Sequence, residues 1–260
     1  MPRARVVLVH GIRTSATMWR GQLARLARHD LDVVAVDLPG HGARLGDRFA
    51  LEDAMATIGE ALGGPVRGVP RLLVGLSLGG YLSIEFAARH PDALEGLVAA
   101  SCGTRPRGVG LHGYLRLADA IGRLPDRGLA LNDRMARLFL PADAVDDIIA
   151  GGVALDVMRP AISAVRELDL EASIAAIEVP IWFVNGRLDH FRLEERRMLR
   201  AAADARLVHI EGATHLVSLA RPDAFTAAVL GAVAELELRE LRRTAAPPAP
   251  AAPMPASAPR

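Results

Sequence analysis

The sequence predicts an α/β fold in which a mostly parallel sheet of about six strands is covered by helices on both faces. Short apolar runs rich in Val and Leu alternate with longer segments of helical periodicity, and each run ends in Gly, Pro or a small polar residue. The predicted strands are Arg5–His10, Leu31–Leu38, Arg71–Leu76, Leu94–Ala100, Val179–Val184 and Ala205–Ile210. A chain of 260 residues, 51% of them hydrophobic, has enough apolar material to bury such a sheet.

Helical patterns lie between the predicted strands. The segment Leu51–Leu62 stops at two glycines, which commonly follow the C-terminal end of a helix. The segment Leu78–Arg89 stops just before Pro91, which cannot continue a helix. The predicted helices of this part of the chain are Ser15–Arg28, Leu51–Leu62, Leu78–Arg89, Leu193–Ala203 and Pro222–Leu241.

The alternation of strands and helices breaks between residues 103 and 178, where no segment has the pattern of a strand. Four helical patterns follow one another there: Leu111–Leu124, Leu129–Leu138, Ala142–Ala150 and Ala154–Leu168. We therefore predict a core made of residues 1–102 and 179–243, with residues 103–178 inserted as a helical cap over the C-terminal edge of the sheet. Residues 244–260 are rich in Pro and Ala, which predicts a disordered tail.

Charge and cysteine content exclude several classes of function. The 31 basic residues are all arginine, they are dispersed, and the net charge is +1, so neither a nucleic acid nor a membrane surface is expected as a partner. The single cysteine, Cys102, allows no internal disulfide and fits a reducing compartment. Because neither a signal peptide nor a membrane-spanning run is recognisable, we expect a cytoplasmic protein that acts on a small molecule.

The strongest chemical signal is the pattern G-x-S-x-G at Gly75-Leu76-Ser77-Leu78-Gly79, between a predicted strand and a predicted helix. A serine on so sharp a turn needs a strained backbone, and side chains at the flanking glycine positions would clash. The turn also directs the first N–H groups of the helix toward the reacting centre. We predict that Ser77 is a nucleophile. The alternative is a tight turn that merely contains a serine.

A serine hydroxyl needs a base, and two later loops offer the groups that would activate it. Asp189 follows the fifth predicted strand and His215 follows the sixth. Catalytic groups gather at the C-terminal ends of parallel strands, so we predict His215 as the general base and Asp189 as its supporting acid. His190 is the alternative base, and Glu178 and Glu211 are alternative acids.

Together these segments resemble the α/β-hydrolase superfamily over nearly the whole chain before the Pro/Ala-rich segment. The matching pieces are His10-Gly11, Asp37-Leu38-Pro39-Gly40-His41-Gly42, the serine turn, Gly186-Arg187-Leu188-Asp189 and His215. The resemblance implies the chain order nucleophile, acid, histidine, and an oxyanion hole formed by the backbone N–H groups of Ile12 and Leu78. It also implies that His10 packs or orients the oxyanion loop. The antiparallel hairpin that opens many members is missing, which predicts a shortened, six-stranded sheet.

The predicted activity is hydrolysis of an ester or related acyl bond in a small, largely apolar substrate, through an acyl-serine. We expect no cofactor and no metal, since a triad and an oxyanion hole suffice for acyl transfer and no metal-binding motif is present. A carbon–carbon bond hydrolase or lyase and a cofactor-free perhydrolase could use the same triad. A non-catalytic ligand-binding protein on the same fold is the alternative from another class. The residues that bind substrate are not predicted.

Overall fold

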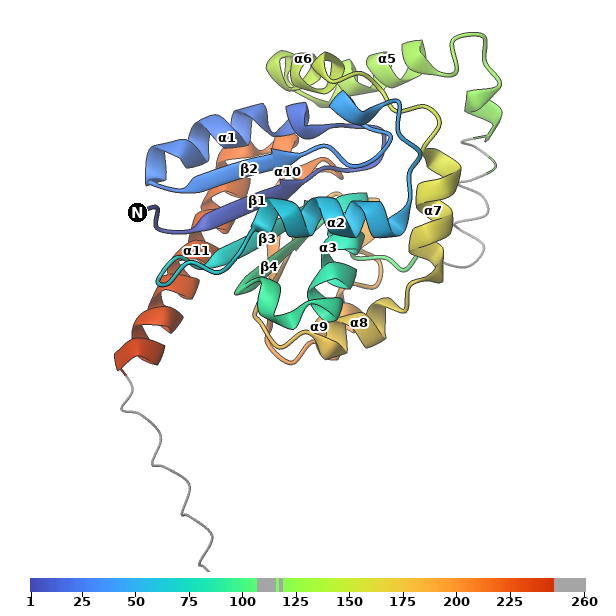
Figure 1. Cartoon of the computed structure of the whole chain (residues 1–260). Helices are drawn as coiled ribbons and strands as arrows, with labels where there is room; N and C mark the ends of the chain where they lie inside the picture. The colour runs from blue at the N-terminus through green and yellow to red at the C-terminus, as the bar shows by residue number, and fades with distance from the viewer. Residues whose placement is uncertain (107–115, 117–118, 246–260) are drawn as a thin grey trace, which may run out of the picture.

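A computed structural model describes residues 1–106, 116 and 119–245 of the chain. Six strands form one sheet in the order β2-β1-β3-β4-β5-β6, and every adjacent pair is parallel. Figure 1 shows β2, β1, β3 and β4 side by side. The strands are β1 (Arg5–Val9), β2 (Asp32–Val36), β3 (Arg71–Leu76), β4 (Gly96–Ala100), β5 (Ile181–Gly186) and β6 (Ala205–Ile210). The predicted shortened, six-stranded sheet is confirmed.

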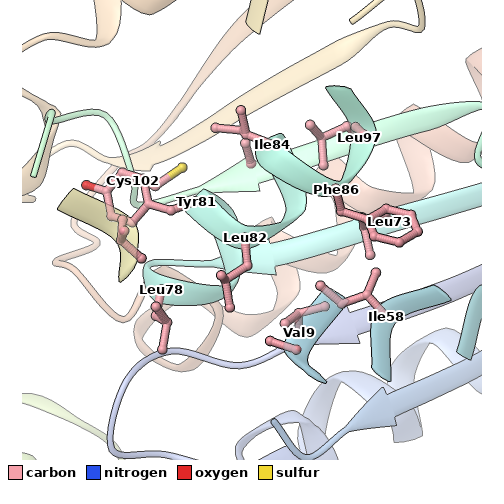
Figure 2. Close-up of a cluster of buried hydrophobic side chains, with 14 of the residues drawn as sticks. Val9, Ile58, Leu73, Leu78, Tyr81, Leu82, Ile84, Phe86, Leu97 and Cys102 are labelled. Atoms are coloured by element: carbon pink, nitrogen blue, oxygen red, sulfur yellow. The ribbon is translucent and has the colours of Figure 1, made fainter. Parts of the chain in front are cut away.

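One face of the sheet is covered by four helices. They are α2 (Leu51–Leu62), α3 (Leu78–Arg89), α8 (Leu170–Ala176) and α9 (Glu195–Ala201). Because side chains of a strand alternate between its two faces, Val9 and Leu73 point into this core while their neighbours point away. Figure 2 shows Val9 and Leu73 beside Ile58 of α2 and Phe86 of α3. Helix α3 is buried along most of its length, so the residue that precedes it is fixed by packing.

The opposite face of the sheet is covered by helices from both ends of the chain. They are α1 (Arg20–Leu26), α10 (Val217–Ala220) and α11 (Pro222–Ala245). Leu72 and Val74 of β3 point into this second core, where the rings of Trp19 and Phe225 lie with centroids 5.9 Å apart. Two closed apolar cores thus confirm the prediction of helices on both faces of one sheet.

Among the described residues between β4 and β5, helices joined by turns and loops occur but no strand does. These helices are α5 (Leu129–Phe139), α6 (Ala142–Ala150), α7 (Met158–Glu167) and α8. Helix α6 touches the segment after β1, where Thr17 Oγ1 donates to the carbonyl oxygen of Asp147 at 2.5 Å. Helix α8, which the sequence pattern did not reveal, packs against α3, and Ser173 Oγ donates to Glu85 Oε2 at 2.7 Å. The helix predicted at 111–124 lies partly outside the described residues.

Several predicted helices differ from the structure at their ends. The helix predicted at Ala154–Leu168 begins only at Met158, as α7, and the one predicted at Leu193–Ala203 is the shorter α9. The segment predicted as one helix, Ser15–Arg28, is α1 flanked by 3-10 turns, with Ser15 capping the first turn. Helix α11 continues through Ala245, past the predicted end at Leu241, and Arg243 pairs with Glu240 at 2.7 Å in its last turn. Residues 244–245 of the predicted tail are therefore helical, and residues 246–260 lie outside the described part. Within that described part, no helix has the length and apolar character needed to cross a membrane.

Candidate active site

The order of the strands places the site. The chain passes from β1 to β2 on one side and then to β3 on the other side of β1, so the connections diverge between β1 and β3. In open α/β sheets, ligands bind at the C-terminal strand ends beside such a point. Here the two loops meet, because a Cβ atom added to Gly11, after β1, would lie 3.5 Å from Cβ of Ser77, after β3. The nucleophile candidate and the predicted oxyanion loop are therefore neighbours.

Ser77 lies on a strained turn between β3 and α3. Its backbone has φ 55° and ψ −113°, values that side-chain-bearing residues rarely adopt. A Cβ on Gly75 would lie 2.2 Å from the carbonyl oxygen of Gly79, and a Cβ on Gly79 would lie 2.3 Å from that of Val9. The Ser77 N–H donates to the Ala100 carbonyl at 2.8 Å. Tight packing on both sides thus holds the serine in a conformation that it would not adopt alone.

Asp189 lies in the loop after β5, and its side chain is fully buried. Its carboxylate accepts a hydrogen bond from the Phe191 backbone N–H at 2.8 Å and faces the His215 ring. Burial by itself raises the pKa of Asp189, but the hydrogen bond and charge of His215 and the Phe191 N–H outweigh it, so the pKa lies below its ordinary value. Asp189 is therefore held as a carboxylate, which can only accept hydrogen bonds.

His215 bridges the other two side chains. Its Nδ1 lies 3.1 Å and 3.2 Å from the two carboxylate oxygens of Asp189, and its Nε2 lies 3.0 Å from Ser77 Oγ. Because the carboxylate only accepts, Nδ1 must carry the ring proton, which leaves Nε2 free to accept from the serine hydroxyl. The His215 side chain is 23% exposed, so the ring remains open to a reactant. The arrangement can remove a proton from Ser77 and return it to a leaving group.

The alternative base and acid do not take part in this chain of contacts. His190 Nδ1 is 4.0 Å from Asp189 Oδ1, and its side chain is 75% exposed. Burial, followed by the neighbouring His215, lowers the pKa of His190. Glu178 is exposed, and Glu211 is exposed beside Arg187. The structure brings together Ser77, Asp189 and His215. His190 borders this chain of contacts without bridging it, with its ring centroid 5.8 Å from that of His215, and the two glutamates are exposed.

A buried polar network supports the loop that carries Asp189. The Ser101 backbone N–H donates to Asn185 Oδ1 at 3.1 Å, and Asn185 Nδ2 donates to Glu195 Oε2 at 2.9 Å. Glu195 Oε1 in turn pairs with Arg192 and His209, each at 3.0 Å. Asn185 and Glu195 are both buried. The network ties the ends of β4 and β5 to the start of α9, on either side of the acid loop.

Sequence reasoning missed several residues that surround the triad. The Phe191 ring packs against the His215 ring, with centroids 4.6 Å apart and planes at 42°. Asn185 carried one signal, since a polar residue in an otherwise apolar strand must find a hydrogen-bonding partner when buried. Phe191 and Glu195 carried none, because their contacts depend on how distant segments meet.

The two predicted oxyanion donors belong to the two segments that meet at Ser77, the start of α3 and the loop after β1. Leu78 is the first residue of α3, and an N–H in the first turn of a helix has no acceptor within that helix. Ile12 follows Gly11 in the loop after β1 and is half-buried against the first apolar core. Their role as donors to an oxyanion stays a prediction, carried by the position of both segments beside the serine.

Comparison with known proteins places this architecture in a family. The profile of the Alpha/beta hydrolase family matches residues 6–228, and the chain belongs to that family. Two relatives named pimeloyl-[acyl-carrier protein] methyl ester esterase are similar over most of their length. The one from Edwardsiella ictaluri is 30% identical, covering 86% of this chain and 91% of the relative. The one from Neisseria meningitidis serogroup C is 28% identical, covering 87% and 93%.

A solved structure gives the same result for the fold. A hydrolase from Pseudomonas aeruginosa superposes with a TM-score of 0.71 at 26% identity, covering 88% of this chain and 89% of that one. The protein is an α/β hydrolase of the carboxylic-ester-hydrolase-like kind.

Proposed function

We propose that the protein hydrolyses a carboxylic ester through an acyl-serine, with Ser77 as nucleophile, His215 as general base and Asp189 as supporting acid. The observation that carries the proposal is the continuous contact from Asp189 through His215 to Ser77, at 3.1 Å and 3.0 Å. Hydrolysis then proceeds as in other serine triads. Ser77 Oγ attacks the carbonyl carbon as its proton passes to Nε2 of His215, and the tetrahedral oxyanion faces the N–H groups of Ile12 and Leu78.

The same groups complete the reaction. The protonated His215 first gives its proton to the departing alcohol, and an acyl-serine remains. Water, deprotonated by His215, attacks that ester and releases the carboxylic acid and the serine hydroxyl. Asp189 stabilises the imidazolium in both steps because it remains ionised beside the ring.

A small, apolar acyl group with a small alcohol is the substrate class that we propose. Ile12 packs against an apolar cluster to which the insertion contributes Ala154 and Val157. The names of the relatives describe a methyl ester, which fits a short alcohol. Their names also describe a carrier protein, but three arginines of the insertion are each paired with an aspartate here: Arg127 with Asp156, Arg137 with Asp133, and Arg159 with Asp119. Arg123, Arg134 and Arg166, also among the described residues of the insertion, form no ion pair, so charge pairing does not decide between a carrier-linked and a free ester. We propose the free ester, and the experiment below includes both.

The experiment is an acyl-length series of p-nitrophenyl and methyl esters, assayed with the native protein and with Ser77→Ala. We expect turnover that depends on acyl length and that Ser77→Ala removes. Equal turnover by both proteins would refute the triad assignment. If the native protein cleaves an acyl methyl ester only when the acyl group is linked to a carrier protein, the substrate is the carrier-linked ester and not the free one.

The location that we propose is a reducing compartment, the cytoplasm. The single cysteine of the chain, Cys102, is free and buried, as is common in proteins of such compartments.

A further inference from the structure

The carbonyl oxygen of Gly11 collects an unusual number of donors for a residue outside regular secondary structure. It lies 2.8 Å from His10 Nδ1, 2.8 Å from Thr14 Oγ1 and 3.4 Å from the Thr14 backbone nitrogen. Both side chains are buried, since Thr14 is 7% exposed and His10 is not exposed at all. A carbonyl oxygen has two lone pairs, so three donors more than saturate it. The orientation of this one peptide group is therefore strongly fixed.

The tautomer of His10 follows from its second contact. Its Nε2 lies 3.1 Å from the backbone N–H of Leu38, which can only donate, so Nε2 is the acceptor. The ring proton must then reside on Nδ1, where it points at the Gly11 oxygen. Burial, followed by the neighbouring His41, lowers the pKa of His10 to about 3, which keeps the ring neutral in this arrangement.

Thr14 reaches the same oxygen from the other side of a turn. Arg13 has φ 64°, and the Thr14 N–H returns to the Gly11 oxygen, as in a type II turn. The Thr14 hydroxyl also lies 3.2 Å from the sulfur of Met18. A thioether is a weak acceptor, so the single hydroxyl proton goes to the carbonyl.

The peptide geometry connects this anchor to catalysis. In a trans peptide the C=O of one residue and the N–H of the next lie in one plane and point in opposite directions. No peptide bond among the described residues is cis. Fixing the Gly11 oxygen therefore fixes the direction of the Ile12 N–H, in a loop where Gly11 packs beside Ser77. Donors on the oxygen also polarise the peptide, which strengthens its N–H as a donor.

We propose that Thr14 is a positioning residue of the oxyanion hole, which acts with His10 by holding the Gly11–Ile12 peptide. The inference rests on the proposed function, because it concerns a donor to the oxyanion of ester hydrolysis. Its effect falls on the transition state, where the oxygen carries charge, and not on binding of the neutral ester.

The test compares Thr14→Val, which keeps the shape but loses the hydroxyl, with Thr14→Ser, which keeps the hydroxyl. Kinetics on a p-nitrophenyl ester are measured beside inhibition by an aryl trifluoromethyl ketone, whose serine adduct is an oxyanion. We expect Thr14→Val to lower kcat about tenfold, a part of the loss caused by removing a whole oxyanion donor. KM stays within about twofold, the inhibition constant rises in parallel with the loss in kcat, and Thr14→Ser stays near native.

Several outcomes would overturn the inference. They are a Thr14→Val enzyme with native kcat, a loss that appears only in KM, and a Thr14→Ser enzyme as impaired as Thr14→Val. If Thr14→Val does not fold, Thr14→Ala is compared with Thr14→Ser instead, and the same changes in kcat, KM and inhibition constant are expected. The Ser77→Ala control separates this result from the proposed function: a native enzyme without Ser77-dependent turnover refutes the function, whereas a fully active Thr14→Val enzyme refutes only the role of Thr14.

Discussion

The nucleophile and the acid–base pair are held in place by different means. On the nucleophile side, the backbone carries the constraint: Ser77 has a positive φ, and the glycines at 75 and 79 leave no room for a Cβ. On the acid–base side, the backbone of Asp189 is ordinary, with φ −74°, and side-chain hydrogen bonds do the holding. One half of the site is defined by close packing and the other by polar pairing.

This difference teaches which changes each half can tolerate. The nucleophile side should be sensitive to atoms that are added, because the neighbouring carbonyl groups cannot move away without distorting the sheet. The acid–base side should be sensitive to hydrogen-bonding capacity that is lost, even when shape is kept. The following substitutions test that contrast.

The largest effect is expected from Asp189→Asn, which keeps the shape but changes the hydrogen bonding. An amide nitrogen facing His215 donates to Nδ1 and so favours the tautomer with the ring proton on Nε2. In that tautomer Nε2 cannot accept the proton of the Ser77 hydroxyl. We expect kcat/KM for an ester to fall by about 10⁴-fold, with the fold retained. Steady-state kinetics with circular dichroism measure both. Activity within tenfold of native would remove Asp189 from the site.

Gly79→Ala should show the opposite pattern, a loss of stability from one added methyl group. Its Cβ would lie 2.3 Å from the Val9 carbonyl oxygen, and we expect the free energy of unfolding to fall by about 3 kcal/mol. Gly231→Ala is the matched control, because a Cβ there meets nothing within 4 Å and the residue lies in α11. That control should be neutral or stabilising by about 0.5–1 kcal/mol. Equal unfolding midpoints in denaturant for both variants would contradict the packing argument.

The lowered pKa of His10, which lies in the loop beside the nucleophile, makes the free energy of unfolding depend on pH. In the unfolded chain its pKa is near 6.5, whereas in the fold it is about 3. Between these values the unfolded chain binds a proton that the folded protein does not, so stability falls as pH drops from about 6.5 toward 3. One such group contributes up to about 1.4 kcal/mol per pH unit.

The measurement is the free energy of unfolding at pH 6.5 and pH 5 for the native protein and for His10→Asn. The variant starts from a lower stability but should lose less of it on acidification. The neighbouring His41, whose pKa burial also lowers, remains in both proteins. Because its ring centroid lies 4.7 Å from that of His10, the difference between the two proteins reports His10 together with its coupling to His41. Identical losses on acidification would show that His10 is protonated in the fold.

Phe191→Leu should give the smallest change. The leucine keeps the backbone N–H that donates to Asp189 but loses the aromatic contact with the His215 ring. Such contacts contribute about 0.5–1.5 kcal/mol, so we expect kcat to fall about threefold to tenfold while Phe191→Tyr stays near native. A Phe191→Leu enzyme with native kcat would show that the Phe191 ring does not help to hold the imidazole of His215 in place.

The same contrast explains what could be predicted from the sequence. The nucleophile turn is local, so five consecutive residues with a strand before and a helix after them were enough to locate it. Asp189 and His215 could be found because parallel strands end at one edge of the sheet. Three other features could not be predicted, because each depends on side-chain directions that are set by packing. They are the Asn185–Glu195 contact, the contact of the Phe191 ring with His215, and the hydrogen bond from Thr14 to the Gly11 oxygen. Helix α8 was missed because it is short and its contact is with a distant helix.

The most direct test of the central claim is labelling by a fluorophosphonate, which reacts with a serine only when that serine is activated. The labelled residue is identified by mass spectrometry of the native protein and of His215→Ala. We predict label on Ser77, at a rate that is at least about 100-fold lower in His215→Ala. Label on another residue, or equal rates in the two proteins, would contradict a triad of Ser77, His215 and Asp189.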